Sequence, residues 1–249
     1  MAERKIQAVV FDIGETLLDF GRVDPKALFK EGGRKAYDFL KNLNQPVGAL
    51  RSFLLGHLIV IRLISIWSNI IKRDFDSLEI LKKINIKKGV KLSEQQWQDF
   101  AWCWYEPLAR CAKIETDIKE TLGKLKQAGI KLGILSNTFI NAVTLEKHLG
   151  QLGILDFFDV RLYSYQFKFR KPDKRIFKEA AKRLNCEPAN VLFVGDRVDT
   201  DIIGALGANM PAVIKKAYTN ALKKIPANVI KIDALAQLVG IVEKEKSSH

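Results

Sequence analysis

Short apolar runs that end at a polar or turn residue recur along this chain and predict buried strands. They cover residues 8–11, 130–134, 191–194, 210–214 and 229–232. Runs of about four to eight apolar residues bounded by turn signals are typical of strands with both faces covered. Segments with apolar residues at helical spacing lie between them, at 117–128, 139–149, 173–184 and 199–206. Strands that alternate with helices predict the α/β class, a parallel sheet with helices on both faces.

Residues 22–112 break this alternation and predict a helical insertion. Asp24 followed by Pro25 is a typical helix start, because proline is favoured at the first helical position. Residues 93–96 resemble a capping box, and Pro107 is expected to end the helix that follows. That helix carries an aromatic stripe, Trp97, Phe100, Ala101, Trp104 and Tyr105. We expect the stripe to form the core of the insertion rather than a platform for substrate.

The most apolar stretch, residues 54–71, lies inside this insertion. Arg62 and several other polar residues interrupt it, and Lys72, Arg73 and Asp74 close it. An arginine near the middle of a membrane-spanning helix is costly in lipid. We therefore predict that the stretch is a buried helix of the insertion, and we expect no membrane partner.

Length and cysteine content point to an ordinary globular protein. A chain of 249 residues, 47% of them apolar, is long enough to bury the core of one large domain that carries an insertion. Its three cysteines lie far apart and are odd in number, so neither a disulfide framework nor a zinc site is expected. Residues 1–6 carry charges and no apolar signal core. These features predict a cytoplasmic protein.

The formal net charge is +13. A lysine-rich, solvated surface is the first interpretation, and attraction of anionic substrates is the second. Nucleic-acid binding comes third, because the lysines are spread along the chain without aromatic interleaving or a known binding motif. No nucleic-acid partner is therefore expected, and the sequence leaves the oligomeric state open.

Polar residues follow three of the predicted strands. Asp12 ends the first apolar run, Ser136 and Asn137 end the second, and Asp196 ends the third. Open parallel sheets bind ligands at the carboxyl ends of their strands. These positions are therefore candidates for one common site.

Four segments together resemble the motifs of a known superfamily. They are residues 11–19, 135–137, 170–173 and 191–201. In this order and spacing they resemble the haloacid dehalogenase (HAD) superfamily, most closely its capped, phosphatase-like subfamily I hydrolases. The resemblance spans roughly residues 6–215. It implies a doubly wound, Rossmann-like core built from residues 1–21 and 113–249, and a helical cap domain at 22–112.

The resemblance also implies roles for individual residues. Asp12 is the nucleophile, and Lys171 pairs with it and with the phosphoryl group of the substrate. Ser136 and the backbone amide of Asn137 bind a phosphoryl oxygen. The substrate is a small phosphorylated metabolite.

Mg²⁺ is the implied cofactor. Its ligands would be one oxygen of Asp12, the main-chain carbonyl of Gly14 and the carboxylate of Asp196, since magnesium prefers oxygen ligands and uses only one or two carboxylates. Asp201 would hold a metal-bound water or orient Lys171. Asp199 is the less favoured candidate for that role.

Position 14 departs from the phosphatase pattern. Phosphatases of the superfamily usually carry a second aspartate there, which protonates the leaving oxygen and then activates water, but this chain has Gly14. A positioned acid or base is worth about 10²–10⁴-fold in rate, so we expect a slow phosphatase. Glu15, a cap residue or a water molecule are the remaining routes for the proton.

The glycine leaves other functions open. Metal-independent 2-haloacid dehalogenases also lack this acid, because halide leaves without a proton, but the carboxylates of Asp196 and Asp201 favour phosphoryl chemistry. Phosphonate-cleaving relatives use a cap lysine, for which this sequence offers several candidates and selects none. A non-catalytic HAD protein that binds a phosphorylated ligand or a protein partner is a further alternative.

Overall fold

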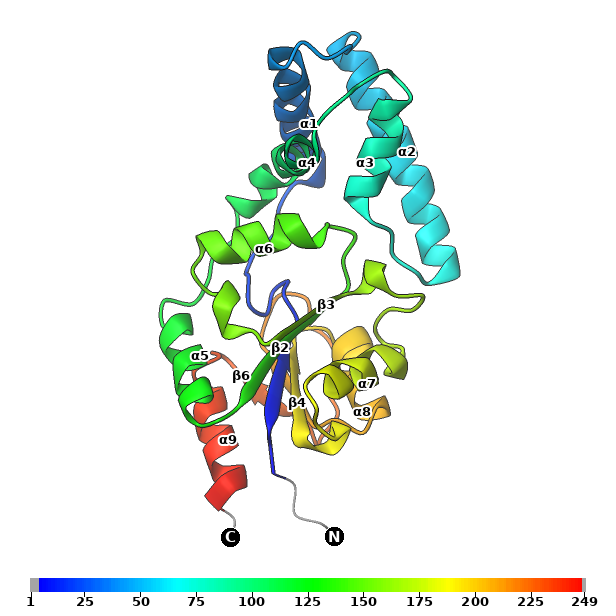
Figure 1. The fold of residues 1–249 in the computed structure, drawn as a ribbon. Helices are drawn as coiled ribbons and strands as arrows, with labels where there is room; N and C mark the ends of the chain where they lie inside the picture. Colours follow the sequence, from blue (N-terminus) through cyan, green and yellow to red (C-terminus); the bar gives the residue numbers. More distant parts are fainter. Residues whose placement is uncertain (1–4, 248–249) are drawn as a thin grey trace.

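The computed structural model describes residues 5–247; residues 1–4, on which part of the expectation of no signal sequence rests, lie outside them. Six parallel strands form a central sheet in the order β3-β2-β1-β4-β5-β6 (Figure 1). The strands are β1 (Ala8–Phe11), β2 (Lys131–Ser136), β3 (Val160–Tyr163), β4 (Val191–Gly195), β5 (Ala212–Lys215) and β6 (Ile230–Ile232). The predicted α/β class with a doubly wound, Rossmann-like sheet is confirmed.

The sequence pattern located every strand of this sheet except β3. This short strand lies at the sheet edge, and Val160 and Arg161 at its start are only partly buried. It therefore lacks the continuous apolar run that marks a strand covered on both faces. The central strand β1, in contrast, is buried at each of its positions.

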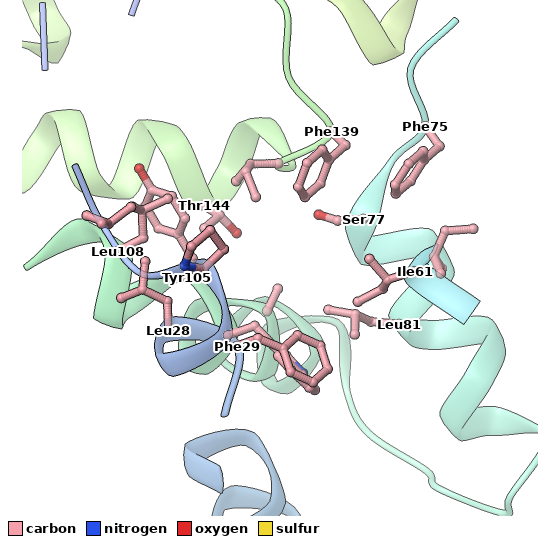
Figure 2. A pocket seen from close by; sticks show the side chains of 16 residues that line it. Leu28, Phe29, Ile61, Phe75, Ser77, Leu81, Tyr105, Leu108, Phe139 and Thr144 are labelled. Carbon is pink, nitrogen blue, oxygen red and sulfur yellow. The ribbon is translucent and has the colours of Figure 1, made fainter. Parts of the chain in front are cut away.

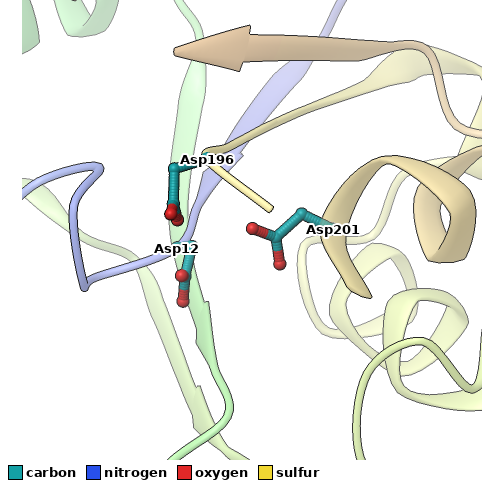
Figure 3. Close-up of side chains that lie close together, drawn as sticks. All are labelled: Asp12, Asp196 and Asp201. Carbon is teal, nitrogen blue, oxygen red and sulfur yellow. The ribbon is translucent and has the colours of Figure 1, made fainter. Parts of the chain in front are cut away.

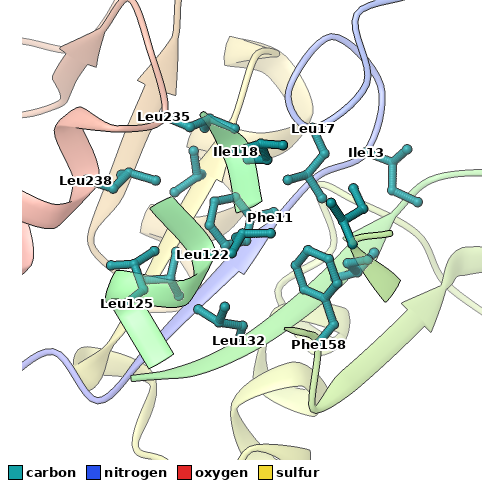
Figure 4. Packing of buried hydrophobic residues seen from close by; sticks show 14 of the residues in the cluster. Phe11, Ile13, Leu17, Ile118, Leu122, Leu125, Leu132, Phe158, Leu235 and Leu238 are labelled. Carbon is teal, nitrogen blue, oxygen red and sulfur yellow. The ribbon is translucent and has the colours of Figure 1, made fainter. Parts of the chain in front are cut away.

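Alternate side chains of β1 enter two cores, one on each face of the sheet. The covering helices are α5 (Ile118–Gln127), α6 (Ala142–Gln151) and α9 (Gln237–Ser247) on one face, and α7 (Lys174–Arg183) and α8 (Ile203–Gly207) on the other. Val9 and Phe11 pack into the first core, whereas Ala8 and Val10 pack into the second. Figure 4 shows Phe11 in the first core, close to Leu122 of α5.

Side-chain caps decide where the core helices begin. Asp173 accepts a hydrogen bond from the backbone of Arg175, so α7 begins where it was predicted. The helix predicted from residue 139 begins only at Ala142, because Asn141 caps it. Short turns complete the core: η1 (Leu155–Phe157), η2 (Ser164–Gln166), η3 (Pro188–Asn190) and the π-helical η4 (Val198–Ile202).

The predicted insertion is helical throughout its regular elements. They are α1 (Pro25–Asn42), α2 (Leu50–Ile71), α3 (Ser77–Ile86) and α4 (Glu94–Ala109). Both predicted helix starts are confirmed, because Asp24 caps α1 and Ser93 forms a capping box with Gln96 on α4. Trp97 and Phe100 of the aromatic stripe are buried in the cap core, as expected.

The expectation that Pro107 ends its helix is wrong. α4 continues through Pro107 to Ala109. A proline this close to a helix end removes a single backbone donor, the one that would bond the carbonyl of Cys103. Both Pro107 and Ala109 are buried, and this packing holds the last turn in place.

The prediction of a buried helix at residues 54–71 is also wrong. α2 packs on the rest of the cap through Phe53 and His57, but most of its other apolar side chains face solvent. Apolar composition indicates a helix here, yet burial depends on whether another element covers it. Among residues 5–247, none covers the outer side of α2.

Two linker segments join the cap to the core. Asp19 and Lys113 exchange backbone hydrogen bonds of 2.8 Å, so the chain leaves the core and returns at neighbouring points. The boundaries at 1–21, 22–112 and 113–249 stay a prediction, and this pairing lies at their junction. The cap stands over the end of the sheet that carries Asp12 (Figure 1).

Gly32 allows α1 and α4 to approach closely. A Cβ placed there would lie 2.5 Å from the backbone oxygen of Trp104. We expect Gly32→Ala to lower the free energy of unfolding by about 1–3 kcal/mol, although alanine favours a helix over glycine by about 1 kcal/mol. Urea unfolding measures the change. Gly56→Ala on α2 is the matched control, because its Cβ would meet only the flexible end of Lys88 at 3.5 Å. Equal losses in both variants would contradict this explanation.

Candidate active site

Three acidic side chains meet at the carboxyl end of the sheet. Asp12 follows β1, Asp196 follows β4, and Asp201 lies in η4; β1 and β4 are neighbours. Figure 3 shows the three side chains close together, and one carboxylate oxygen from each lies within 4.8 Å of the others. All three side chains are buried. The structure thus brings together the acidic residues that the sequence nominated separately.

Lys171 is the cation of this cluster. Its ammonium lies 2.9 Å from Asp12 Oδ1 and 2.7 Å from Asp201 Oδ1, and the residue is only 2% exposed. Burial alone would lower the pKa of Lys171, but the two adjacent carboxylates outweigh it and hold the pKa above its ordinary value. The ammonium of Lys171 therefore faces Asp12, the residue that the resemblance names as nucleophile, and its role toward the phosphoryl group stays a prediction.

Asn137 holds Lys171 through its side chain, a role that the sequence did not indicate. Its amide accepts a hydrogen bond from the backbone N–H of Lys171 and donates one to the backbone carbonyl, each 2.8 Å long. Ser136 is buried at the end of β2, beside β1. Binding of a phosphoryl oxygen by Ser136 and by the backbone amide of Asn137 stays a prediction.

Asp201 is engaged at both carboxylate oxygens. Oδ1 pairs with Lys171, and Oδ2 accepts a 3.0 Å hydrogen bond from the backbone of Arg197. This arrangement suits the second of its two expected roles, the orientation of Lys171. Asp199 pairs with the exposed side chain of Arg197 instead. Gly195 makes room for Asp201, since a Cβ there would overlap its carboxylate.

Hydroxyl and amide groups hold Asp196. Thr16 donates to Oδ1 at 3.3 Å, Thr219 donates to Oδ2, and Asn220 donates to the backbone carbonyl at 2.8 Å. Sequence reasoning missed Thr219 and Asn220. They lie in the loop that follows β5, several residues past its last residue, Lys215, so the strand-end rule that located Asp12 does not single them out.

The acidic cluster fits a divalent cation. Three buried carboxylates face one buried ammonium, which leaves surplus negative charge. Burial and the charge of Asp12 raise the pKa of Asp196 to about 7, although its hydrogen bond from Thr219 opposes the shift. A bound cation reverses such shifts, and the donors are the hard oxygen ligands that Mg²⁺ prefers. Asp12, Asp196 and Asp201 could together hold such an ion, and the assignment of Asp12, Asp196 and the Gly14 carbonyl as its ligands stays a prediction.

Gly14, two residues after Asp12, has open space where a side chain would lie. A Cβ at this position would meet no atom within 4 Å. Glu15, the nearest alternative acid, has a left-handed backbone with φ 55°, and its carboxylate accepts a hydrogen bond from the backbone of Phe20. Burial and the neighbouring Asp19 raise the pKa of Glu15 to about 7. Its side chain is thus tied to the linker segment toward the cap.

A polar cleft of about 890 Å³ opens at Asp12 and Lys171. Both domains line it: Asn69, Ile71 and Lys72 come from the cap. Its rim is rich in basic residues, Lys72, Lys168, Arg170, Arg175 and Arg197. An anionic ligand would therefore be attracted to the cleft at Asp12, in line with the second interpretation of the net charge.

A separate apolar cavity of about 320 Å³ lies between the cap and the core. Figure 2 shows Phe29 and Tyr105 on one side and Phe75 and Phe139 on the other. It shares no lining residue with the cleft at Asp12. The cavity is therefore part of the contact between cap and core rather than of the charged site.

Arg170 connects the cap to the core beside the site. Its guanidinium pairs with Asp74 at 2.5 Å and donates to Asn69 at 2.9 Å. A second link runs from Asn141 to Asp76, 2.8 Å long. These contacts assign Arg170 to holding the cap against the core.

Fold and site define a class of protein: a capped α/β protein with a buried aspartate–lysine pair at the carboxyl end of its first strand. Residues 6–209 match the model of the haloacid dehalogenase-like hydrolases, and the chain belongs to this family of hydrolases. The resemblance found in the sequence is thereby confirmed.

Curated relatives include phosphatases. The chain is 36% identical over 129 residues to a glyceraldehyde 3-phosphate phosphatase of Methanothermobacter thermautotrophicus, an alignment covering 49% of this chain and 55% of the relative. The chain thus spans about half the length of the first curated relatives it matches. A glyceraldehyde 3-phosphate phosphatase of Pyrococcus furiosus is 26% identical over 250 residues, 98% of this chain and 96% of the relative.

Solved structures support the fold. A HAD phosphatase from Thermococcus onnurineus matches with a TM-score of 0.59 and 23% identity, covering 95% of this chain and 98% of the other. A 2-haloacid dehalogenase from Pseudomonas syringae pv. tomato matches with a TM-score of 0.62 and 22% identity, covering 96% and 99%. Because one fold carries both chemistries, the choice between them depends on the residues of the site.

Proposed function

We propose that this protein is a Mg²⁺-dependent phosphatase of a small phosphorylated metabolite in the cytoplasm. The observation that carries the proposal is the buried cluster of Asp12, Lys171 and Asp196. It combines a carboxylate able to act as nucleophile, a cation beside it, and surplus negative charge that suits a divalent metal. The relatives named glyceraldehyde 3-phosphate phosphatase support a substrate of this size and charge.

The chemistry follows from what each side chain contacts. A carboxylate oxygen of Asp12 attacks phosphorus, the alcohol oxygen leaves with the electrons of its bond, and an aspartyl phosphate forms. Lys171, fixed by Asp201 and Asn137, stabilises negative charge as it develops on the phosphoryl oxygens. Mg²⁺, when bound, supplies further charge neutralisation. Water then hydrolyses the aspartyl phosphate and restores Asp12.

The site lacks an obvious side chain for proton transfer. Gly14 carries no acid for the leaving oxygen and no base for the attacking water. One carboxylate oxygen of Glu15 accepts a hydrogen bond from the backbone of Phe20, which ties this acid to the linker segment. We therefore infer slow turnover, fastest on esters whose leaving group is itself acidic and needs little help from a protonated side chain.

A haloacid dehalogenase is the second candidate, and Gly14 is the observation that favours it. Displacement of halide needs neither a proton nor a metal. A metal-independent reaction gives the buried Asp196 no function, because without a metal ion its carboxylate adds repulsion to that of Asp12. The phosphatase proposal gives a function to both Asp12 and Asp196.

Metal removal tests the proposal directly. Phosphate release from p-nitrophenyl phosphate and from a panel of phosphorylated metabolites, glyceraldehyde 3-phosphate among them, is measured at high protein concentration with Mg²⁺ or with EDTA. We expect release that falls by about 10²-fold or more in EDTA and returns when Mg²⁺ is added in excess.

The same panel separates the alternatives. Halide release from 2-chloropropionate that is unaffected by EDTA would replace the phosphatase with a dehalogenase. Saturable binding of a phosphorylated metabolite without release of phosphate or halide would identify a non-catalytic binding protein.

A further inference from the structure

The outer side of α2 is largely apolar, with the exposed Arg62 near its middle. We call it the α2 stripe; it consists of Leu55, Leu58, Ile59, Leu63, Ile66, Trp67, Ile70 and Ile71. Leu63 is 62% exposed, Trp67 61% and Ile70 71%. Their spacing of three or four residues places them on one face of a helix roughly 33 Å long. Contiguous exposed apolar surfaces of this kind mark interaction sites.

The fold itself cannot cover the stripe, because the opposite side of α2 is already attached. His57 is buried between Phe53 and Trp104, and its ring contacts the side chain of Asn85 at 3.0 Å. At the far end, Asn69 is bonded to Arg170 of the core. Turning the stripe inward would break each of these contacts. Its occupant must therefore come from outside the chain's own fold.

The basic residues on and near α2 indicate what binds to the stripe. α2 contains no acidic residue, and Arg51 and Arg62 lie exposed along it, with Lys72 and Arg73 at its end. Within residues 5–247, the side chains of these four basic residues form no ion pair. An exposed tryptophan on an apolar helix face flanked by basic residues is the pattern of helices that lie in the interface of anionic membranes.

A second copy of this chain fits the stripe less well. Two-fold pairing of α2 with itself would bring Arg62 of each copy, at the middle of the helix, near its counterpart. No carboxylate on either helix would compensate that repulsion. A membrane of anionic phospholipids offers both an apolar layer and negative charge.

We propose that the α2 stripe binds the surface of an anionic phospholipid bilayer. The helix lies in the interface and does not span it, because its inner side stays packed on the cap through Phe53 and His57. Asn69, Ile71 and Lys72 at its end line the cleft at Asp12, so a docked protein holds the cleft beside the lipid headgroups. The proposal replaces the expectation of no membrane partner, which rested on a buried helix.

Flotation with vesicles tests this binding. The full-length protein is mixed with vesicles of phosphatidylcholine alone, or of phosphatidylcholine and phosphatidylglycerol in equal parts, and the bound fraction is measured. We expect binding to the anionic vesicles that weakens as salt is raised. The Leu63→Gln/Trp67→Gln variant should bind at least about tenfold more weakly, since it removes two exposed apolar anchors. Arg62→Gln should weaken binding less and reduce the salt dependence.

Leu222→Gln is the matched control. Leu222 is 100% exposed on the core and lies outside the stripe, so its replacement should leave vesicle binding unchanged. Thermal unfolding by circular dichroism checks that each variant is folded. Equal loss of binding in the control, equal binding to neutral vesicles, or no binding at all would overturn the proposal. So would a dimer in sedimentation velocity that Leu63→Gln/Trp67→Gln dissociates while vesicle binding is absent.

Discussion

Gly14→Asp is expected to raise the phosphatase kcat by about 10²-fold, because it supplies the acid that this site lacks. The space for the new side chain exists: a Cβ at position 14 meets nothing within 4 Å, and the backbone there does not have a positive φ. The gain should be larger for an alkyl phosphate than for p-nitrophenyl phosphate, whose leaving group needs no proton. Steady-state kinetics on both substrates measures the two gains.

Gly14→Asn is the matched control for this gain. Asparagine has nearly the same size and shape as aspartate but neither donates a proton to the leaving oxygen nor deprotonates water. It should leave kcat close to that of the unmodified protein. Gains of the same size with asparagine and aspartate would assign the effect to packing. No gain with aspartate would mean that proton transfer does not limit this site.

Asp12→Asn is expected to lower phosphate release by about 10³-fold or more, because an amide cannot form the covalent phosphoryl intermediate. The fold should remain intact, since the change removes one of three crowded buried charges without changing the shape of the side chain. Phosphate release and thermal unfolding, measured on the same preparation, separate the loss of chemistry from a loss of structure.

Asp38→Asn serves as the control for that experiment. Asp38 is exposed on α1 of the cap, so its replacement should leave phosphate release unchanged. An Asp12→Asn protein that is folded and retains most of its activity would place the nucleophile elsewhere, and the assignment of the site would be wrong.

Much of the site could be predicted because parallel sheets put their reactive groups at strand ends. Asp12, Ser136 and Asp196 each lie at the end of a largely apolar run, so the sequence pattern located the three strands and the polar residues at their ends. Lys171 has no such strand before it, and the resemblance to the HAD motifs located it. Its ion pairs with two of the acids agree with that assignment.

The supporting contacts could not be predicted in the same way. Thr219 and Asn220 are ordinary turn residues in sequence, and their function depends on β5 lying beside β4. The side chain of Asn137 bonds a backbone 34 residues away. Such contacts arise from tertiary packing, which local composition does not encode.

α2 shows the same limit on a larger scale. Its apolar residues predicted a helix correctly and burial incorrectly. The sequence of a helix shows which of its sides are apolar. Whether an apolar side is buried depends on a partner surface elsewhere in the chain or in another molecule. β3 was missed for the opposite reason: Arg161 interrupts its apolar run, although the strand pairs fully with β2.

The contact of Arg170 with Asp74 links the position of the cap to the position of the Lys171 ammonium. Arg170 is the residue next to Lys171, and its guanidinium binds Asp74 and Asn69 of the cap. If the cap moves away to admit a ligand, these contacts of Arg170 break. The backbone that positions the ammonium of Lys171 then loses one restraint. When the cap returns, the contacts of Arg170 form again. The site is therefore held most rigidly when the cap closes it off from bulk solvent.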